Sequence, residues 1–244
     1  MNGKTELLQV FFNSVDKDEL LCELEKLIKG KCGGYVVTPN PEILMLSFED
    51  SEYRNILNNA SLCIVDGIGV EYAARILKVK LKPRIPGVEI GDMVLSLCER
   101  KSVPVFLLGG KPGVAGEAAE KIVGSKPMID IRGYMHGYFA DDDAVVEEIN
   151  NSGAEVLFVC LGAPYQEKWI ASNICKLKNV KLALCLGGSL DIYSGSVARA
   201  PLIIRKCGLE WLWRGLSSRE RFSRMLRLPA FIIHTLKVKN SMKR

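Results

Sequence analysis

Residues 156–167 read VLFVCLGAPYQE, an apolar run followed at once by glycine, proline and a polar pair. Six consecutive apolar residues are typical of a strand buried on both faces, as in a parallel sheet covered by helices. The polar pair, Gln166 and Glu167, falls in the first turn of the helix expected to follow. This junction predicts an α/β fold that carries functional side chains where its strands end.

The same alternation of strand and helix runs through the first 198 residues. Strands are expected at Leu7–Phe12, Gly34–Val37, Leu62–Val65, Pro104–Leu108, Met128–Ile131, Val156–Leu161 and Lys181–Leu186. Amphipathic helices are expected at 17–29, 41–57, 70–77, 88–100, 112–124, 142–151 and 165–176. The pattern predicts a Rossmann-like, largely parallel sheet with right-handed crossovers and helices on both faces.

Charge divides the chain into two parts. Residues 199–244 hold twelve Lys and Arg against two acids, whereas residues 1–198 hold 21 basic and 26 acidic residues. The second part also reads as helices only, at Pro201–Cys207, Leu209–Leu216, Ser218–Leu228 and Ala230–Val238. We therefore expect a catalytic α/β domain over 1–198 and a basic helical appendage over 199–244 that docks on something anionic.

Composition argues against several classes of protein. The eight cysteines stand singly, and Cys63, Cys160 and Cys185 fall in strand-like runs, which predicts reduced core thiols. Two histidines, His136 and His234, speak against a histidine-rich metal site or a Ser/His/Asp hydrolase. No apolar run is long enough to cross a bilayer, and the N-terminus lacks the pattern of a signal peptide, so a cytoplasmic location is expected.

Small and polar residues mark five strand ends, where ligands bind in open α/β sheets. Thr38 and Asn40 follow one strand; Asn40 could equally be the cap of the next helix. Asp66 and Gly67 follow another; the aspartate could cap a helix or act as a general base. Gly110, Gln166, Gly187 and Asp191 occupy the remaining strand ends.

Two local patterns allow competing interpretations. The glycine-rich turn Gly109–Gly116, with Asp130 some twenty residues on, imitates a dinucleotide fingerprint and suggests an NAD-dependent oxidoreductase as an alternative. Its spacing is imperfect, and it does not follow the first strand. The acidic run Asp141–Asp143 could suggest a metal site, but its place ahead of a helix favours a helix start.

A set of motifs in order resembles the WecG/TagA/CpsF glycosyltransferase family, and within it most closely the N-acetylmannosaminyltransferases of wall teichoic acid linkage-unit synthesis. The motifs are Thr38–Asn40, Asp66–Gly67, Pro83–Gly87, Leu107–Gly110, Gly133–Phe139, Gly162–Glu167, Gly187–Asp191, Arg199–Pro201 and Gly208–Arg214. The resemblance covers nearly the whole chain. Glu89 departs from it, because an aspartate is commoner there.

The resemblance implies inverting, metal-independent transfer of N-acetylmannosamine from UDP-N-acetylmannosamine to undecaprenyl-diphosphate-linked N-acetylglucosamine, without a cofactor. It implies Asp66 as the base, with Thr38, Asn40 and Gln166 near the donor sugar. It sets Arg84, Gly109, Tyr138 and Asp191 near the nucleotide or its phosphates. Gly67, Gly110 and Gly187 are expected to let the donor approach the backbone. A uronic acid of the same sugar stays open as the donor.

The appendage is expected to do two jobs. It would hold the protein on the inner face of the cell membrane, where the short apolar segment Ala230–Val238 suits lying in the interface. Arg214, Arg221 and Arg224 would close onto diphosphate, which arginine recognises well. Self-association is also plausible. A module that binds nucleic acid or lipid without catalysis is a further alternative, which leaves the strand ends unexplained; no nucleic-acid partner is expected.

Overall fold

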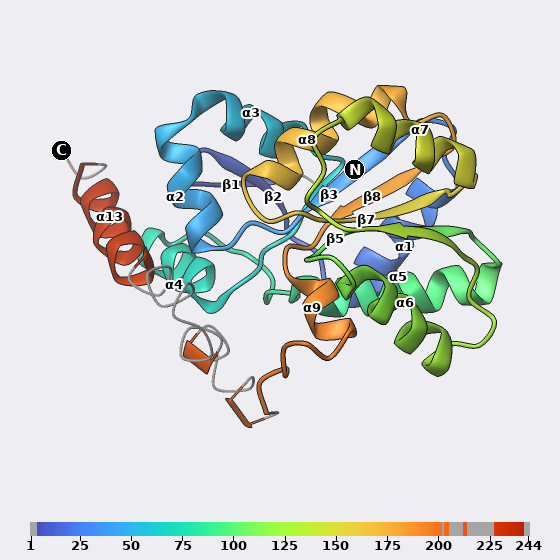
Figure 1. The fold of residues 1–244 in the computed structure, drawn as a ribbon. Coiled ribbons are helices and arrows are strands. Elements are labelled where there is room, and N and C mark those ends of the chain that lie inside the picture. Colours follow the sequence, from blue (N-terminus) through green and yellow to red (C-terminus); the bar gives the residue numbers. More distant parts are fainter. Residues whose placement is uncertain (1–3, 202, 205–211, 214–226, 242–244) are drawn as a thin grey trace.

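The structure, a computed structural model, describes residues 4–201, 203–204, 212–213 and 227–241. Its centre is a six-stranded, all-parallel sheet in the order β4-β3-β8-β7-β5-β6 (Figure 1). The strands are β3 (Gly34–Val37), β4 (Leu62–Cys63), β5 (Val105–Gly109), β6 (Ile131–Met135), β7 (Val156–Cys160) and β8 (Leu182–Cys185). The predicted α/β class and parallel sheet are confirmed.

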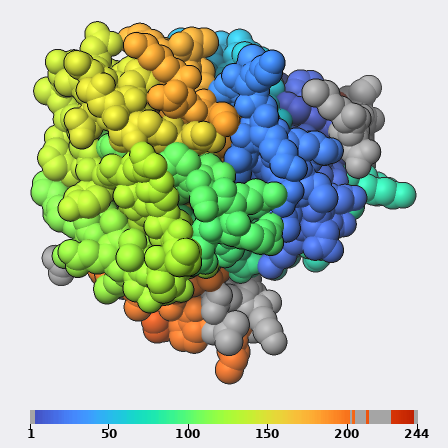
Figure 2. All heavy atoms as spheres, turned by 90° about the vertical axis from the view of Figure 1, so that its right-hand side faces the viewer, coloured from blue at the N-terminus to red at the C-terminus, as the bar shows by residue number. Residues whose placement is uncertain are grey.

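Helices cover both faces of this sheet. One face packs against α1 (Lys17–Lys29), α5 (Gly87–Lys101), α6 (Val114–Ser125) and α9 (Ser189–Tyr193). The other packs against α2 (Pro41–Glu49), α3 (Ser51–Asn59), α4 (Ile68–Leu77), α7 (Asp142–Ser152) and α8 (Tyr165–Asn173), and α13 (Arg227–Ser241) extends that side by packing on α2 and α4. A 3₁₀ turn, η1 (Ile174–Lys176), follows α8. Figure 2 looks onto one end of the molecule, where blue, green and yellow segments form the surface.

Strand β7 explains why the apolar runs are unbroken. Leu157 and Val159 enter the core on the face of α8, whereas Val156 and Phe158 enter the core on the face of α5. All four side chains are fully buried. Because successive side chains of a strand point to opposite faces, a strand covered on both sides needs apolar residues at every position. Cys63, Cys160 and Cys185 are buried free thiols, as predicted.

The predicted strand Leu7–Phe12 is wrong. These residues belong to an antiparallel hairpin of β1 (Lys4–Leu7) and β2 (Val10–Asn13), which forms a separate two-stranded sheet. Leu8 and Gln9 make the turn, both with positive φ, of 56° and 65°. Two such residues form the tight turn that matches strand twist, but Asn and Gly are the usual signal for it. Because Leu8 and Gln9 include no glycine, asparagine or proline, the sequence gives no turn signal between the two strands.

Other boundaries also differ from the prediction, and two of these differences have a clear structural cause. The helix expected over 41–57 is divided at Asp50, which ends α2 through its own N–H and caps α3 by accepting from Tyr53 N at 2.9 Å. The strand expected at Met128–Ile131 begins only at Ile131 and continues through Gly133. A Cβ on Gly133 would lie 2.6 Å from the Phe106 ring, so a glycine is needed where these strands pair.

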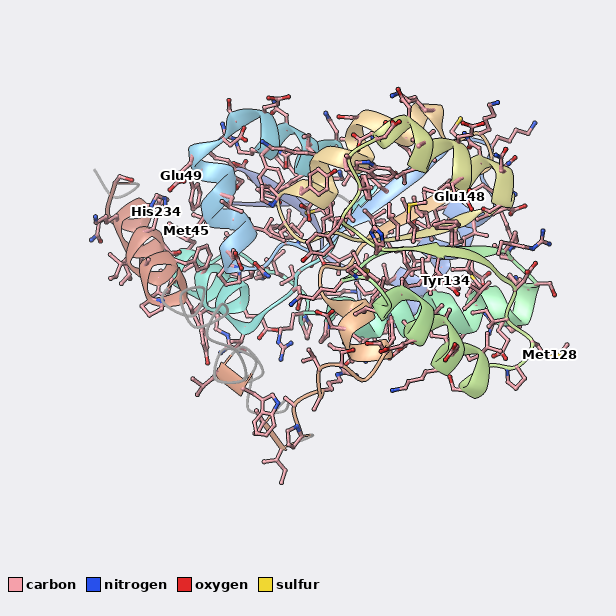
Figure 3. All side chains as sticks on the ribbon, in the orientation of Figure 1. Met45, Glu49, Met128, Tyr134, Glu148 and His234 are labelled. Atoms are coloured by element: carbon pink, nitrogen blue, oxygen red, sulfur yellow. The ribbon has the colours of Figure 1, made fainter. Side chains whose placement is uncertain are left out.

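The C-terminal helix α13 packs against α2 and α4 (Figure 1). Its Phe231 and Thr235 are fully buried, and the His234 ring stacks on Phe48 with centroids 4.2 Å apart. His234 and Met45 of α2 mark this junction in Figure 3. The segment predicted at Ala230–Val238 lies within α13, whereas most of the three preceding predicted helices lies outside the described residues. Among described helices, none combines the length and apolarity that a bilayer span requires.

Glu89 joins the start of the basic segment to the body. Its carboxylate accepts from Lys17 Nζ at 2.8 Å and from Arg199 Nη2 at 2.9 Å. Burial by itself would raise the pKa of Glu89, but the hydrogen bond from Lys17 and the charges of both cations outweigh it and lower the pKa. The carboxylate that departs from the family pattern thus has a structural role, as the anchor of Arg199.

Candidate active site

A cleft of about 600 Å³ lies at the carboxyl ends of the parallel strands, where a sheet of this kind binds ligands. Six helices begin beside it, and residues at or just before those starts line the cleft: Asn40 and Pro41 (α2), Gly67 and Ile68 (α4), Pro86 and Gly87 (α5), Gly110 and Lys111 (α6), Gln166 (α8), and Gly187 and Gly188 (α9). Helix N-termini present unpaired N–H groups and positive partial charge. The cleft is therefore suited to an anionic ligand such as a phosphate.

Asp66 and Thr38 face each other across Gly87. A Cβ built on Gly87 would lie 3.3 Å from Thr38 Oγ1 and 3.8 Å from Asp66 Oδ2. Asp66 follows β4, and its N–H donates to the Pro39 carbonyl at 3.2 Å. Thr38 is buried, and its hydroxyl donates to the Cys185 carbonyl at 3.3 Å. The end of β3 and the loop after β4 thus bring a hydroxyl and a carboxylate to one small space.

Asn40 is a helix cap, as one interpretation of the sequence had it. Its Oδ1 accepts from Ile43 N at 3.0 Å at the start of α2. The side chain also lines the cleft, so capping leaves its amide nitrogen for a ligand. Gly67 sits beside it with φ of 81°, and a Cβ there would meet Pro41 Cδ at 3.2 Å. Glycine is needed here because both the angle and the contact exclude a side chain.

Gln166 belongs to a buried chain of hydrogen bonds. Its Nε2 donates to Glu167 Oε1 at 2.6 Å, and its Oε1 accepts from Gly187 N at 2.9 Å. Tyr53 donates its hydroxyl proton to Glu167 Oε2 at 2.9 Å. Burial raises the pKa of Glu167, and the hydrogen bonds from Gln166 and Tyr53 oppose that rise. The sequence pointed to Gln166 but gave no sign of Tyr53, which lies 114 positions away from Glu167.

The wall of the cleft opposite Asp66 carries glycines and a lysine. Gly110, Lys111, Gly137 and Tyr138 line it, and Gly137 N donates to the Gly110 carbonyl at 2.9 Å. Gly109, grouped with them from the sequence, does not line the cleft. A Cβ on Gly109 would lie 2.2 Å from the Cys160 carbonyl oxygen, so this glycine serves the close approach of β5 to β7.

The remaining predicted residues divide into two groups. Arg84, Gly187 and Asp191 line the cleft with Asp66 and Gln166. Arg214, Arg221 and Arg224 lie outside the described residues. Several residues that were not selected from the sequence also line the cleft, among them Glu42 in the first turn of α2 and Leu228 of α13. A repeated strand-end pattern could have suggested Glu42, but no sequence signal links Leu228 to the cleft.

The structure removes the support for two competing interpretations. Asp130 precedes β6, at the opposite end of the strand from the cleft, and forms an ion pair with Arg132 at 2.7 Å. A dinucleotide site needs such an acid at the carboxyl end of its strand. Asp141 caps α7 by accepting from Asp143 N and Ala144 N, which confirms the acidic run as a helix start.

A thiol also lines the cleft. Burial raises the pKa of Cys160 to about 12, so the neutral form predominates at neutral pH. Because the thiolate is the nucleophilic form of cysteine, Cys160 is a wall residue here. The acids of the described lining are Glu42, Asp66 and Asp191, and its cations are Arg84 and Lys111. This arrangement favours proton transfer and anion binding.

Comparison with known proteins agrees with this geometry. The family model described as "Glycosyl transferase WecG/TagA/CpsF family" matches residues 5–244. The chain belongs to the WecG/TagA/CpsF glycosyltransferase family. This places the strand-end cleft in an α/β glycosyltransferase and confirms the resemblance recognised in the sequence motifs.

Several curated members of the WecG/TagA/CpsF family are similar over most of their length. A Bacillus subtilis protein is 35% identical across 90% of this chain and 86% of its own. A Staphylococcus aureus protein is 32% identical across 99% of this chain and 96% of its own. A Bacillus spizizenii protein is 35% identical across 84% of this chain and 79% of its own. All three are named N-acetylglucosaminyldiphosphoundecaprenol N-acetyl-beta-D-mannosaminyltransferase.

Proposed function

We propose that this protein transfers N-acetylmannosamine from UDP-N-acetylmannosamine to N-acetylglucosamine on undecaprenyl diphosphate, a step in wall teichoic acid linkage-unit synthesis. The names of the similar family members support this sugar over its uronic acid. The observation that carries the proposal is that Asp66 Oδ2 and Thr38 Oγ1 both lie within 4 Å of the position a Cβ on Gly87 would take, in a cleft lined by the starts of several helices.

In the proposed reaction Asp66 acts as the general base. Its carboxylate takes the proton of the acceptor hydroxyl while the hydroxyl oxygen bonds to the anomeric carbon of the donor. The bond between that carbon and the phosphate oxygen breaks in the same step, and UDP departs as the anion. A single in-line displacement of this kind inverts the anomeric centre and needs one carboxylate. The neutral thiol of Cys160 supports direct displacement over a cysteine-linked intermediate.

Positive charge for the departing diphosphate would come from the cleft itself. Lys111 and Arg84 lie in its wall, and the starts of α6 and α9 present backbone N–H groups. We propose that the nucleotide lies toward Gly110, Lys111 and Tyr138, and that Asp191 and Gly187 contact it from the β8 side. Arg214, Arg221 and Arg224 are proposed to add charge once the acceptor is bound.

The C-terminal helix is proposed to meet the membrane. Ile233 is 56% exposed and Leu236 44% exposed on α13, and the exposed Lys237 lies next to Leu236. Apolar side chains flanked by lysines suit the headgroup region of an anionic bilayer. The proposed site of action is therefore the inner face of the cell membrane, where the polyprenyl acceptor is embedded.

The direct test is transfer by the full chain with a polyprenyl-diphosphate acceptor and UDP-N-acetylmannosamine, followed by mass spectrometry of the lipid product. Asp66→Asn should reduce the rate by about a hundredfold or more while UDP still binds. Asp130→Asn is the matched control, since it changes an acid at the far end of the sheet and should leave the rate unchanged. Product formation by Asp66→Asn at the parent rate would refute Asp66 as the base.

The same assay separates the alternatives. In a parallel reaction UDP-N-acetylmannosaminuronic acid replaces UDP-N-acetylmannosamine, and we expect no transfer. In a binding measurement NADH replaces the nucleotide sugar, and we expect no binding.

For the membrane contact, the double variant Ile233→Ser/Leu236→Ser should float less with anionic vesicles than the parent. Because both side chains are exposed, its melting temperature should stay within a few degrees. Unchanged flotation would contradict the proposed role of α13.

A further inference from the structure

The buried chain that runs from Tyr53 through Glu167 to Gln166 connects three separate elements next to the cleft. Tyr53 comes from α3, Glu167 and Gln166 from α8, and Gly187 from the turn after β8. Tyr53 and Glu167 are fully buried, and Gln166 is 2% exposed. Among the described residues, no Lys, Arg or His forms an ion pair with Glu167. A buried carboxylate without a cation weakens folding, so its presence beside the cleft calls for a functional reason.

The hydrogen bonds fix which way the Gln166 amide points. Its NH₂ group faces the Glu167 carboxylate, and its carbonyl oxygen faces the Gly187 N–H. A flipped amide would set oxygen against carboxylate and NH₂ against N–H, and would lose both bonds. The carbonyl oxygen and one NH₂ proton are thereby engaged inside the protein. The second NH₂ proton remains, on a side chain that lines the cleft.

We propose that Glu167, itself held by Tyr53, is a positioning residue that makes Gln166 a hydrogen-bond donor to an oxygen of the bound nucleotide sugar. This inference rests on the proposed function, because it takes the occupant of the cleft to be that donor substrate. Glu167 does not touch the substrate. Its effect passes through the amide of Gln166, whose orientation one acceptor, Glu167 Oε1, and one backbone donor, Gly187 N, determine.

The decisive variant removes both buried partners together. In Tyr53→Phe/Glu167→Met the hydrogen bond between these two residues loses both partners, a change that is often neutral for stability, and one proton of the Gln166 amide loses its acceptor. We expect a melting temperature within a few degrees of the parent, yet kcat/KM for the donor about tenfold lower or more, because Gln166 can then rotate. A merely structural role predicts no loss of kcat/KM at preserved stability.

Two further variants keep the inference testable if that one misfolds. Glu167→Gln still offers a carbonyl oxygen to Gln166 and should stay within about threefold of the parent kcat/KM. Tyr53→Phe should lower it, and Tyr35→Phe is the matched control: Tyr35 also buries its hydroxyl, which donates to the Ile56 carbonyl at 2.7 Å, but does not contact Glu167. Equal losses in Tyr53→Phe and Tyr35→Phe would overturn the inference.

Failure of this inference is distinguishable from failure of the proposed function. If the parent protein does not transfer the sugar, the proposed function fails, and calorimetric binding of UDP-N-acetylmannosamine still compares the variants. Weaker binding by Tyr53→Phe/Glu167→Met than by the parent supports the positioning role. Equal binding and equal kcat/KM in this variant, with an active parent, would refute the positioning role and leave the transferase intact.

Discussion

Leu228 of α13 lies directly over Gly69 of α4, so closely that a methyl group on Gly69 would come within 2.4 Å of Leu228 Cδ1. The same methyl group would lie 2.5 Å from Pro41 Cγ at the start of α2. The C-terminal helix therefore rests on the first turns of the two helices that begin after Asn40 and Gly67. A contact between the last helix and the cleft wall is built into the fold.

Gly69→Ala tests this contact. We expect it to lower the free energy of unfolding by about 1–3 kcal/mol, because the new methyl group must displace Leu228 or Pro41. Gly124→Ala in α6 is the matched control, since nothing lies within 4 Å of its added Cβ. Alanine there should be neutral or stabilising by up to about 1 kcal/mol. Urea unfolding of both variants gives the comparison; equal stabilities would contradict the close packing.

Phe231 is the side chain that holds α13 to the body. It is fully buried within the core shared with α2 and α4, so Phe231→Ala should cost about 3–5 kcal/mol of stability or release the helix. Ile233→Ala, two positions on, changes a side chain that is 56% exposed and should cost less than about 0.5 kcal/mol. Thermal unfolding and limited proteolysis at α13 measure the two. A Phe231→Ala protein as stable as Ile233→Ala would refute the docked arrangement.

Gly87→Ala should narrow the space between Thr38 and Asp66. The added methyl group would lie 3.3 Å from the threonine hydroxyl and 3.8 Å from the aspartate, in the position that the proposed substrate occupies. The helix propensity of alanine opposes the cost of this close contact, so the melting temperature should change by only a few degrees. We expect a rise in the donor KM or a loss of kcat of about tenfold, measured with Gly124→Ala alongside. Unaltered kcat and KM would contradict the proposal that the reacting atoms lie next to Gly87.

Glu167 gives the stability a definite pH dependence. Burial raises its pKa above the ordinary value of 4.5. At pH values between 4.5 and the raised pKa of Glu167, the folded chain binds more protons than the unfolded chain. The free energy of unfolding therefore falls as pH rises through this range. Glu167→Gln removes the titration, and its stability relative to the parent should therefore increase from about pH 5 to about pH 8. Urea unfolding at both pH values gives the difference.

Glu89 supplies a control of opposite sign. Lys17 and Arg199 hold the pKa of Glu89 below 4.5 despite its burial. Its contribution to the free energy of unfolding is therefore present above pH 4.5 and is lost as pH falls through the pKa of the folded state. Glu89→Gln should lose stability relative to the parent near neutral pH and should approach it in acid. The same sign of change for Glu89→Gln and Glu167→Gln would show that one of the two assignments is wrong.

Much of the fold could be predicted because five of the six strands of the main sheet are short and apolar, whereas the strand predicted for β6, with Arg132 and Gly133, begins too early. The residues after β3, β4, β7 and β8 could be predicted for the same reason: parallel strands bring their ends to one edge. The hairpin at Leu8 and Gln9 could not, because its turn depends on positive φ at residues that rarely adopt it. Contacts between distant positions, such as Tyr53 with Glu167, leave no local pattern to follow.

The last helix shows a different limit. An apolar segment flanked by lysines can bury one face against protein or against lipid, and periodicity alone does not distinguish the two. In the structure Phe231 and Thr235 face the body, while Ile233 and Leu236 are exposed. The expected lipid contact of Ala230–Val238 therefore concerns one side of a helix whose other side packs on protein. The lipid side stays a prediction.

Strand order has a consequence for how the protein is made. β7 and β8 are synthesised last among the six, yet they lie in the middle of the sheet, between β5 and β3. In a nascent chain that ends after β6, the pairs β4-β3 and β5-β6 lack the two strands that join them in the sheet. Gln166 and Gly187 are also not yet present. Asp66 then lacks the part of the cleft that the segments after β7 and β8 supply. We expect an incomplete chain on the ribosome not to consume nucleotide sugar, because the insertion of β7 and β8 completes the proposed active-site cleft.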